Sequence, residues 1–382
     1  MANVFTPLAP TLFSAAQEVA AEPFGAVDSV NANFADKGVA IGDTVTVPVA
    51  PVRAASTYTP AMTTSAGTDA TASSVAVQIT ANRMVSWNLT GEQVRSLQNG
   101  GNYEEWVRQL IAQGMRTLRN EAEAELCGVI YRGASRAIGT SGTNPFASTL
   151  DSLVDARKLL RDNGAPMADL QAVFNTTAGA AALKLGVIAN AYQAGTEQER
   201  RQGVFLRQYG FMLKESAGIA SHTKGAGTGY DVDLTAGYVV GDTTIHLDGG
   251  TANTTGVAIG DAVTFAGDTN QYIVKTGTGD NAEADIVIGK PGLRATLADA
   301  VEMTITNSYS ANLAFERNAV VAVMRPPLIP PNANIQQRTI SDGKGMTYLL
   351  VQVAGDGMVT WRLHLAWGFA VVNPEYVCVV KG

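Results

Sequence analysis

The sequence has few of the residues that most catalytic and metal sites use. Its 382 residues include two cysteines and three histidines. Cys127 and Cys378 are too few for a disulfide scaffold and neither lies in a C-x-x-C pair, so we expect two packed free thiols, as in a reducing cytosol. The histidines lie in different segments without the spacing of metal ligands; they are His222, His246 and His364. We therefore predict no catalytic, cofactor-binding or metal-binding residues and no cofactor.

Charge and long apolar runs are also scarce. Charged residues make up 16% of the chain, and the formal net charge of −7 argues against a phosphate-binding patch. Glycine, alanine, threonine and serine fill the surface instead, which favours a surface that partners cover. No apolar run approaches the roughly 20 residues that span a bilayer. The first basic residue is Lys37, so the start lacks the positive region of a secretory signal peptide.

The motifs that are present do not indicate an enzyme. There is no G-x-x-x-x-G-K-[ST] and no G-x-S-x-G. "GAGTG" at 225–229 has no strand before it and no basic helix after it, so we interpret it as a flexible domain linker. Glu121, Glu123 and Glu125 are interpreted as three solvated acids on one helix rather than as a metal site. An interaction protein is favoured over an enzyme.

The N-terminal quarter indicates a short helix and an extended hairpin. Apolar residues recur near helical spacing in 8–21, and Pro23 limits that helix. From residue 44 the period becomes two, and "VAVQITANRMVSWNL" at 75–89 alternates again after a small, polar stretch at 54–74. We expect two strands flanking a long tip that projects from the body.

The next region indicates a long helix followed by an α/β unit. Apolar residues recur at three and four from 102 to 133, with Asn102 as the expected N-cap and Gly133 as the expected stop. This helix would be about 45 Å long. Two further helices are predicted at 149–164 and 176–186, with a buried strand at 170–175 between them. Residues 190–204 are expected to form an exposed loop.

From about residue 220 to 307 short alternating segments follow one another between Gly, Asp and Asn turns. This rhythm predicts a small all-β barrel or sandwich of about six strands, inserted in another domain whose strands resume after it. "GVAIGDTVTV" at 38–47 and "GVAIGDAVTF" at 256–265 agree at eight of ten places, but the similarity stops there. We interpret them as two independent strand starts that use the same Gly-Asp turn.

This order of elements resembles the major capsid protein of tailed bacteriophages with the Hong Kong 97-type fold, in particular podovirus coat proteins with an inserted β-barrel domain. The stretches that carry the resemblance are "NTTAGAAALKLG", "IGDAVTFAGDTNQYIV", "LAFERNAVVAVMRPPLIPPNAN" and "WRLHLAWGFAVVNPEYVCVV". The fold class implied is α+β, with a long spine helix, an extended β-hairpin loop and an α/β axial domain.

The resemblance also implies a division of the chain into seven parts. They are an N-terminal arm (1–39), an extended loop (40–90), a peripheral domain (91–147) with the spine helix at 102–133, a first axial part (148–219), the inserted β-barrel domain (220–307), a second axial part (308–352), and C-terminal strands returning to the peripheral and axial core (353–382).

The function implied is a shell protein that assembles as hexamers and pentamers into the icosahedral head around double-stranded DNA. Scaffolding protein and portal are the implied partners, with a decoration protein as a further one, and DNA is enclosed without sequence-specific binding or any contact with membrane. The implied location is the virion, and the host cytoplasm during assembly. Some relatives cross-link their subunits covalently, through an isopeptide bond from a lysine of the extended loop. No lysine occurs between Lys37 and Lys158 in this sequence, so we expect no such cross-link. An encapsulin-type nanocompartment shell and, less favoured, a surface-layer or adhesin-like protein stay open as alternatives.

Overall fold

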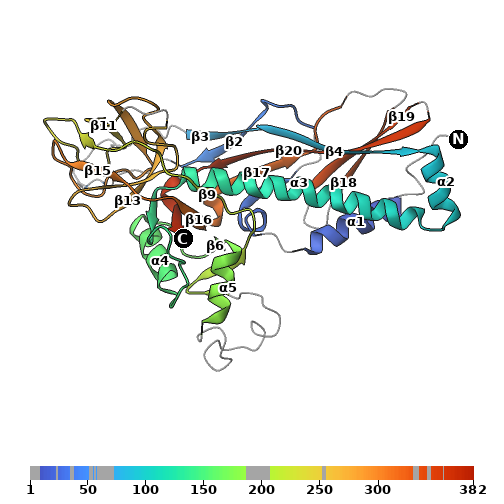
Figure 1. Cartoon of the computed structure of the whole chain (residues 1–382), viewed down its shortest axis with the longest axis horizontal. Coiled ribbons are helices and arrows are strands. Elements are labelled where there is room, and N and C mark those ends of the chain that lie inside the picture. The colour runs from blue at the N-terminus through green and yellow to red at the C-terminus, as the bar shows by residue number, and fades with distance from the viewer. Residues whose placement is uncertain are drawn as a thin grey trace.

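The computed structural model describes residues 9–22, 25–34, 38–50, 55, 57, 73–185, 207–251, 255–329, 335–341, 346–355 and 357–382. The expected loop at 190–204 and most of the expected hairpin tip at 54–74 lie outside these residues. The chain is an elongated mixed α+β molecule, with a long helix running beside a sheet and a β-barrel at one end (Figure 1). The α+β fold class with an all-β insert is therefore confirmed.

The long helix α3 (Tyr103–Gly133) forms because its apolar stripe has a sheet and a second helix to pack against. The stripe recurs at three and four and is fully buried; it includes Val107, Ile111, Met115, Leu118, Ala122, Leu126 and Ile130. Asn102 holds the expected N-cap position, but its side chain makes no capping bond. Gly133 is the last residue of the helix, as expected. Packing requires a glycine there, since a Cβ would lie 2.5 Å from Cγ2 of Val371.

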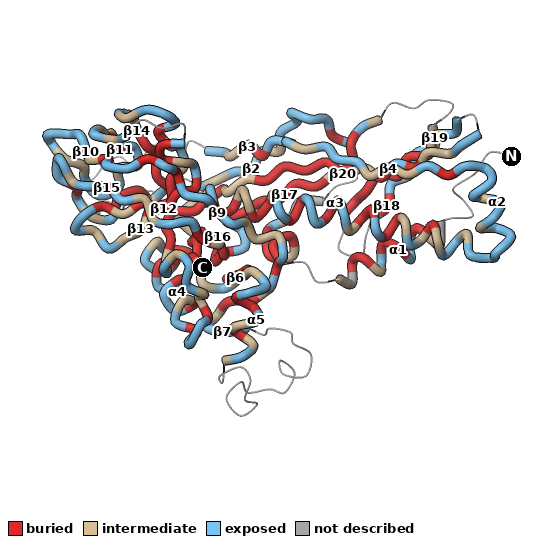
Figure 2. The backbone as a smooth tube through the Cα atoms, viewed as in Figure 1, coloured by how far each residue is buried: buried red, intermediate tan, exposed pale blue. Residues whose placement is uncertain are grey.

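A six-stranded sheet lies beside α3, as the buried strands in Figure 2 show. Its strands run in the order β1 (Asn31–Phe34), β17 (Val320–Arg325), β20 (Met358–Val371), β19 (Thr347–Ala354) and β18 (Ile335–Ser341), and β4 (Ala81–Thr90) pairs with β20. The β4–β20 pairing continues over ten residue pairs, from Met358–Thr90 to Trp367–Ala81. Between β4 and α3 lies α2 (Gly91–Asn99), which was not predicted.

A second sheet continues into the lower part of the molecule in Figure 1. It orders β5 (Arg136–Ile138), β21 (Val377–Lys381), β16 (Tyr309–Glu316), β6 (Leu170–Phe174), β8 (Phe211–Glu215) and β7 (Arg207–Gln208). Helices α4 (Asp151–Asp162) and α5 (Thr176–Lys184) share its apolar core. The helices and the strand predicted for this region are confirmed, with ends that differ by up to two residues.

The expected axial segment 308–352 is divided between the two sheets. Strand β16 pairs with β6 of the second sheet, whereas β18 and β19 join β20 and contribute to the core around α3. Three short 3-10 turns complete the connections. The turn η2 (Val27–Ser29) lies between α1 (Ala9–Ala21) and β1, η3 (Arg317–Ala319) joins β16 to β17, and η4 (Pro374–Tyr376) joins β20 to β21. The strand pairing thus separates residues that the resemblance grouped in one domain.

The insert closes on itself. Its strands run β12 (Ala262–Phe265), β15 (Glu302–Ile305), β10 (Tyr230–Val232), β11 (Thr244–Asp248), β14 (Ala284–Ile288) and β13 (Gln271–Thr276), and β13 pairs back with β12. The six strands have an apolar core of their own. The chain passes between body and barrel beside β9 (Ser221–His222), which pairs with β16. "GAGTG" is not a flexible linker: Gly225 and Gly227 are buried, and Cβ atoms there would lie 2.2 and 2.9 Å from the oxygen of Gly256.

The two "GVAIGD" stretches make the same turn in different places. Gly42 and Gly260 adopt positive φ of 96° and 93°, a conformation that suits glycine. In each turn the following aspartate accepts from a backbone N–H three residues earlier, Ala40 to Asp43 at 2.8 Å and Ala258 to Asp261 at 2.7 Å. A third turn at 239–242 repeats both features. The interpretation as a shared local device is therefore confirmed.

Candidate functional site

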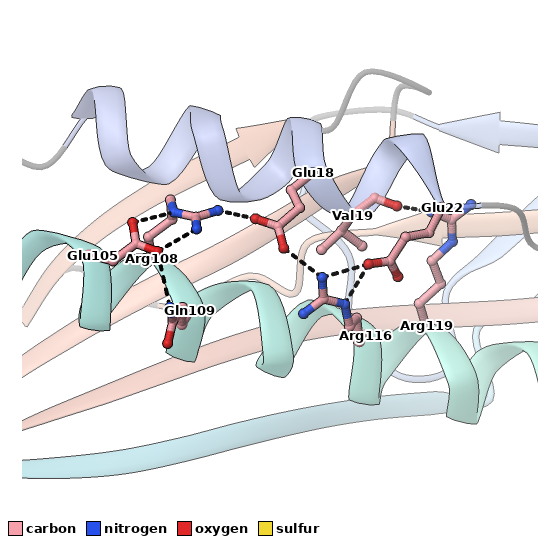
Figure 3. Close-up of polar contacts among 8 residues, drawn as sticks. All are labelled: Glu18, Val19, Glu22, Glu105, Arg108, Gln109, Arg116 and Arg119. Carbon is pink, nitrogen blue, oxygen red and sulfur yellow. Dashed lines mark hydrogen bonds and ion pairs between the residues drawn. The ribbon is translucent and has the colours of Figure 1, made fainter.

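The N-terminal helix α1 (Ala9–Ala21) docks lengthwise on α3. Its apolar face is buried; it comprises Leu12, Ala15, Ala16 and Val19. The polar side carries a row of ion pairs in which Glu18 is held by both Arg108 and Arg116, and Arg116 also reaches Glu22 at 2.6 Å (Figure 3). Hydrogen bonding from Arg116 holds the pKa of Glu18 below its usual value. Because these groups are partly exposed, each pair contributes modestly and is weakened by salt.

One step further along α3 the contacts become buried. Arg119 is fully buried and bonds to Asp28 at 3.1 Å and to the carbonyl of Val19 at 3.3 Å. The Glu123 carboxylate accepts from the backbone N–H groups of Ala26 (2.6 Å) and Val27 (2.8 Å). These two N–H groups open the η2 turn, so the carboxylate satisfies donors that would otherwise be left without a partner.

The three acids of α3 therefore have different environments, and the interpretation as three solvated acids is wrong. Glu123 is 4% exposed and also accepts from Ser216 Oγ at 2.7 Å, so it fastens the arm and the segment after β8 to the helix. Glu125 accepts from the indole N–H of Trp367 at 2.8 Å. Only Glu121 lies at the surface, where it pairs with Arg83 at 2.9 Å.

A two-stranded ribbon lies on the other side of the sheet. Strands β2 (Thr44–Val49) and β3 (Ser73–Gln78) pair antiparallel from Thr44–Gln78 to Val49–Ser73, as the hairpin prediction requires. The predicted second strand is split, because β4 leaves the ribbon and pairs with β20. At the base, Gly368 lets the carbonyl of Gln78 approach to a point 2.0 Å from where a Cβ would stand. Both outer edges of the ribbon lack a paired strand among the described residues.

The three histidines lie on three different strands, His222 on β9, His246 on β11 and His364 on β20. His222 is buried at the junction of body and barrel, with Nε2 2.8 Å from Asp261 and its ring between Tyr131 and Tyr309. His246 lies at the barrel surface, where the Asp285 carboxylate 2.6 Å away raises its pKa.

The remaining histidine, His364, is on β20, and burial lowers its pKa. His246, at the barrel surface, has two further acidic neighbours besides Asp285, namely Asp233 and Glu283. His246 and these three carboxylates form an ion-paired group at the surface. The histidines are not brought together in one site.

Large apolar side chains are exposed at several turns, a feature that the sequence interpretation missed. Ile41 and Ile259 follow the alanine of the two "GVAIGD" turns and are 65% and 52% exposed. Val240 holds the same place in the third turn, and Leu328 is 75% exposed. The sequence signal was the repeated apolar residue before Gly-Asp, which local turn chemistry does not require.

In the described part of the chain no helix is long and apolar enough to cross a membrane.

No family model and no curated protein matches the chain. Among solved structures it is similar to one described as Mycobacterium phage Che8, with 12% identity over 89% of this chain and 84% of that chain and a TM-score of 0.47. It is also similar to the capsid structure of cyanophage P-SCSP1u, with 12% identity, coverage of 94% and 89%, and a TM-score of 0.45. A virus-like particle from Pyrococcus furiosus gives 10% identity, coverage of 97% and 98%, and a TM-score of 0.44. By their printed descriptions, the second of these structures is a phage capsid and the third is a virus-like particle.

Proposed function

We propose that this protein is the major capsid protein of a tailed bacteriophage, a structural protein that assembles into the icosahedral head. The observation that carries the proposal is the β2–β3 ribbon, whose two outer strand edges are unpaired among the described residues. Unpaired strand edges hold rows of N–H and C=O groups that pair readily with a strand of another chain. A subunit that meets many copies of itself supplies such strands, whereas an isolated soluble protein protects its edges.

Two further features support a role in assembly rather than catalysis. Exposed apolar residues lie at separate turns on both body and barrel, which suits several small contacts with different neighbours. Many weak contacts acting together hold a closed shell while each remains reversible during assembly. The buried His222 and Glu123, by contrast, are engaged in holding the subunit together.

The strand pairing suggests a revised division of the chain, which we propose in place of the sequence-based boundaries. The extended loop would be residues 40–79, because β4 belongs to the main sheet. The peripheral domain would combine α1, α2 and α3 with β18, β19 and most of β20. The axial domain would be built on β16, β6, β8, α4 and α5. The insert would keep its limits near 220 and 307.

In this proposal the subunits form hexamers and pentamers around DNA that the wall confines without sequence-specific binding. Scaffolding protein, portal and a decoration protein would be the other partners, in the host cytoplasm during assembly and in the virion afterwards. The net charge of −7 fits a wall that does not grip the packaged nucleic acid. The lack of lysine between 37 and 158 supports a shell without lysine cross-links from the loop.

Electron microscopy of the expressed full-length chain tests the proposal. Icosahedral particles or aberrant shells are expected, and a monodisperse small oligomer under all assembly conditions would contradict it. The double variant Ser74→Lys and Ala76→Lys places charge on exposed positions of β3, so it should leave the circular dichroism spectrum unchanged and reduce particle yield. Asp280→Lys, in a barrel turn, is the control for an added lysine. DNA or protein content of the particles separates a phage head from an encapsulin-type compartment.

A further inference from the structure

A cavity lies where the barrel meets the body. It has a volume of about 290 Å³, is open to solvent on one side, and is lined by residues of β5, the start of β13 and helix α4. Most of the groups that line it are polar or charged; those used below are Arg136, Asp155, Lys158, Asp162 and Asn270. Strands β5 and β13 pair directly, Gln271 with Ala137 and Tyr272 with Arg136, so the cavity adjoins a rigid joint between the two parts.

The side chain of Arg136 is a buried cation without an anionic partner. The residue is 6% exposed, and none of the described carboxylates lies within 4.0 Å of its guanidinium. Its two terminal nitrogens donate to amide oxygens, to Asn270 Oδ1 at 2.8 Å and to Asn163 Oδ1 at 2.7 Å. The third nitrogen, Nε, is buried and has no hydrogen-bond partner in the described part of the chain.

The two amide groups are fixed in this orientation by bonds of their own. Asn163 donates to the carbonyl of Glu375 at 2.7 Å, and Asn270 donates to Asp268 at 2.6 Å, so both amide oxygens are turned to the guanidinium. Neutral amides satisfy hydrogen-bond donors but supply no negative charge, and Asp162 offsets the charge of Arg136 only from beyond ion-pair distance. The fixed geometry therefore holds a charged group ready in the absence of a counter-ion.

Other cations reinforce the positive potential. Burial, followed by the positive charge of Arg294, lowers the pKa of Arg136, and the nearby Asp162 raises it in part. Lys158 lines the same cavity from α4. Asp155 and Asp162 also line it. These two carboxylates and Lys158 are exposed, so solvent screens their charges more strongly than that of the buried arginine, and Arg136 is the principal charge of the cavity.

We propose that this cavity binds one small oxyanion, a phosphate or carboxylate group, with Arg136 as the principal partner and Lys158 as a supporting cation. A guanidinium matches the oxygens of both groups in charge and geometry. An anion in this place bridges β5, β13 and α4, so it fastens the barrel to the body. The two carboxylates in the lining, Asp155 and Asp162, oppose a second anion and so limit the site to a single small anionic group.

The test uses full-length protein in chloride buffer at constant ionic strength, titrated with inorganic phosphate and separately with acetate by isothermal calorimetry. Wild type should bind phosphate saturably with one anion per chain. Lys158→Ala should weaken binding about threefold to tenfold, and Asp155→Asn should strengthen it by a similar factor. Arg157→Ala, on the same helix but outside the cavity lining, should stay within about twofold of wild type. Arg136→Gln should abolish binding.

The results distinguish the source of the anion and can overturn the site. Saturable binding of acetate as well as phosphate assigns the site to carboxylates too, such as an acidic side chain of another molecule, and phosphate alone assigns it to phosphate groups. If Arg136→Gln does not fold, Lys158→Ala and Asp155→Asn decide. The proposal is overturned if wild type shows no saturable binding of either anion up to about 10 mM. It is also overturned if Lys158→Ala and Asp155→Asn both behave like Arg157→Ala.

Discussion

Replacing Glu123 by glutamine should destabilise the protein far more than the same change at Glu121. The Glu123 carboxylate accepts three bonds, from Ala26 N–H, Val27 N–H and Ser216 Oγ, at 2.6, 2.8 and 2.7 Å. Glutamine has the same shape, but only one of its two terminal atoms accepts. With the amide oxygen in the place of Oε1, the amide nitrogen faces the Val27 N–H group.

The magnitude follows from these contacts. A buried donor left without a partner costs about 1–3 kcal/mol, and each of the two remaining bonds loses about 1 kcal/mol when its acceptor is no longer charged. The expected loss is therefore about 3–5 kcal/mol in the free energy of unfolding. Glu121 is an exposed partner of Arg83, so Glu121→Gln should lose about 0–1 kcal/mol.

Urea unfolding of unassembled subunits at low concentration, followed by tryptophan fluorescence, measures both losses. Hydrogen exchange locates the effect, because amide protection should fall first at residues 25–30. A loss under about 1 kcal/mol for Glu123→Gln, or one no larger than that of Glu121→Gln, would refute the assignment of Glu123 as the anchor of the arm.

Three other outcomes are expected. Glu18→Gln should lower the hydrogen-exchange protection of α1, and less so in about 1 M salt. Because the folded pKa of Glu18 lies below its ordinary 4.5, its contribution in wild type is fully present above pH 4.5 and is lost as pH falls through the folded pKa, which exchange at stepped pH measures. Gly368→Ala should destabilise the protein by about 1–3 kcal/mol or prevent docking of the ribbon. Gly128 is an interior residue of α3 whose added Cβ would meet no atom within 4 Å, so Gly128→Ala should stabilise the protein by about 0.5–1 kcal/mol in thermal unfolding. Burial raises the pKa of both Cys127 and Cys378, the latter to about 12, so neither thiol should react with a disulfide reagent at pH 8 until urea is added, and reaction of the folded protein would contradict the buried placement.

The elements predicted well are those whose signal is local. The stripe of α3 repeats along one segment, and the barrel strands alternate between turn residues, so periodicity alone identifies both. The missed helix α2 has no fully buried residue, and its apolar stripe is limited to Val94 and Leu97. Its one signal was the capping box of Thr90 and Gln93, in which each side chain bonds to the other's backbone N–H.

The functional side chains were harder to predict because tertiary contacts decide their roles. Glu121 and Glu123 are two residues apart on one helix, and only the arm and Ser216, brought from distant segments, make the second a buried anchor. The pairing of β4 with β20 joins segments more than 250 residues apart, and no local pattern distinguishes it from a longer hairpin. Arg136 likewise has no sequence signature, since its amide partners come from α4 and the barrel.

The pairing of β9 with β16 has a consequence for how such a chain can change. His222 and Ser221 already face Tyr309 and Ser310, so the chain leaves the body and returns to it at neighbouring points. A domain of almost any size can occupy that interval, because lengthening a loop whose ends stay together costs only a slowly growing entropy. The junction is therefore an insertion site at which one folded domain can be replaced by another, in evolution or by design, while the rest of the subunit keeps its fold. The chief adjustment would be at β5, whose edge against β13 would need a new cover.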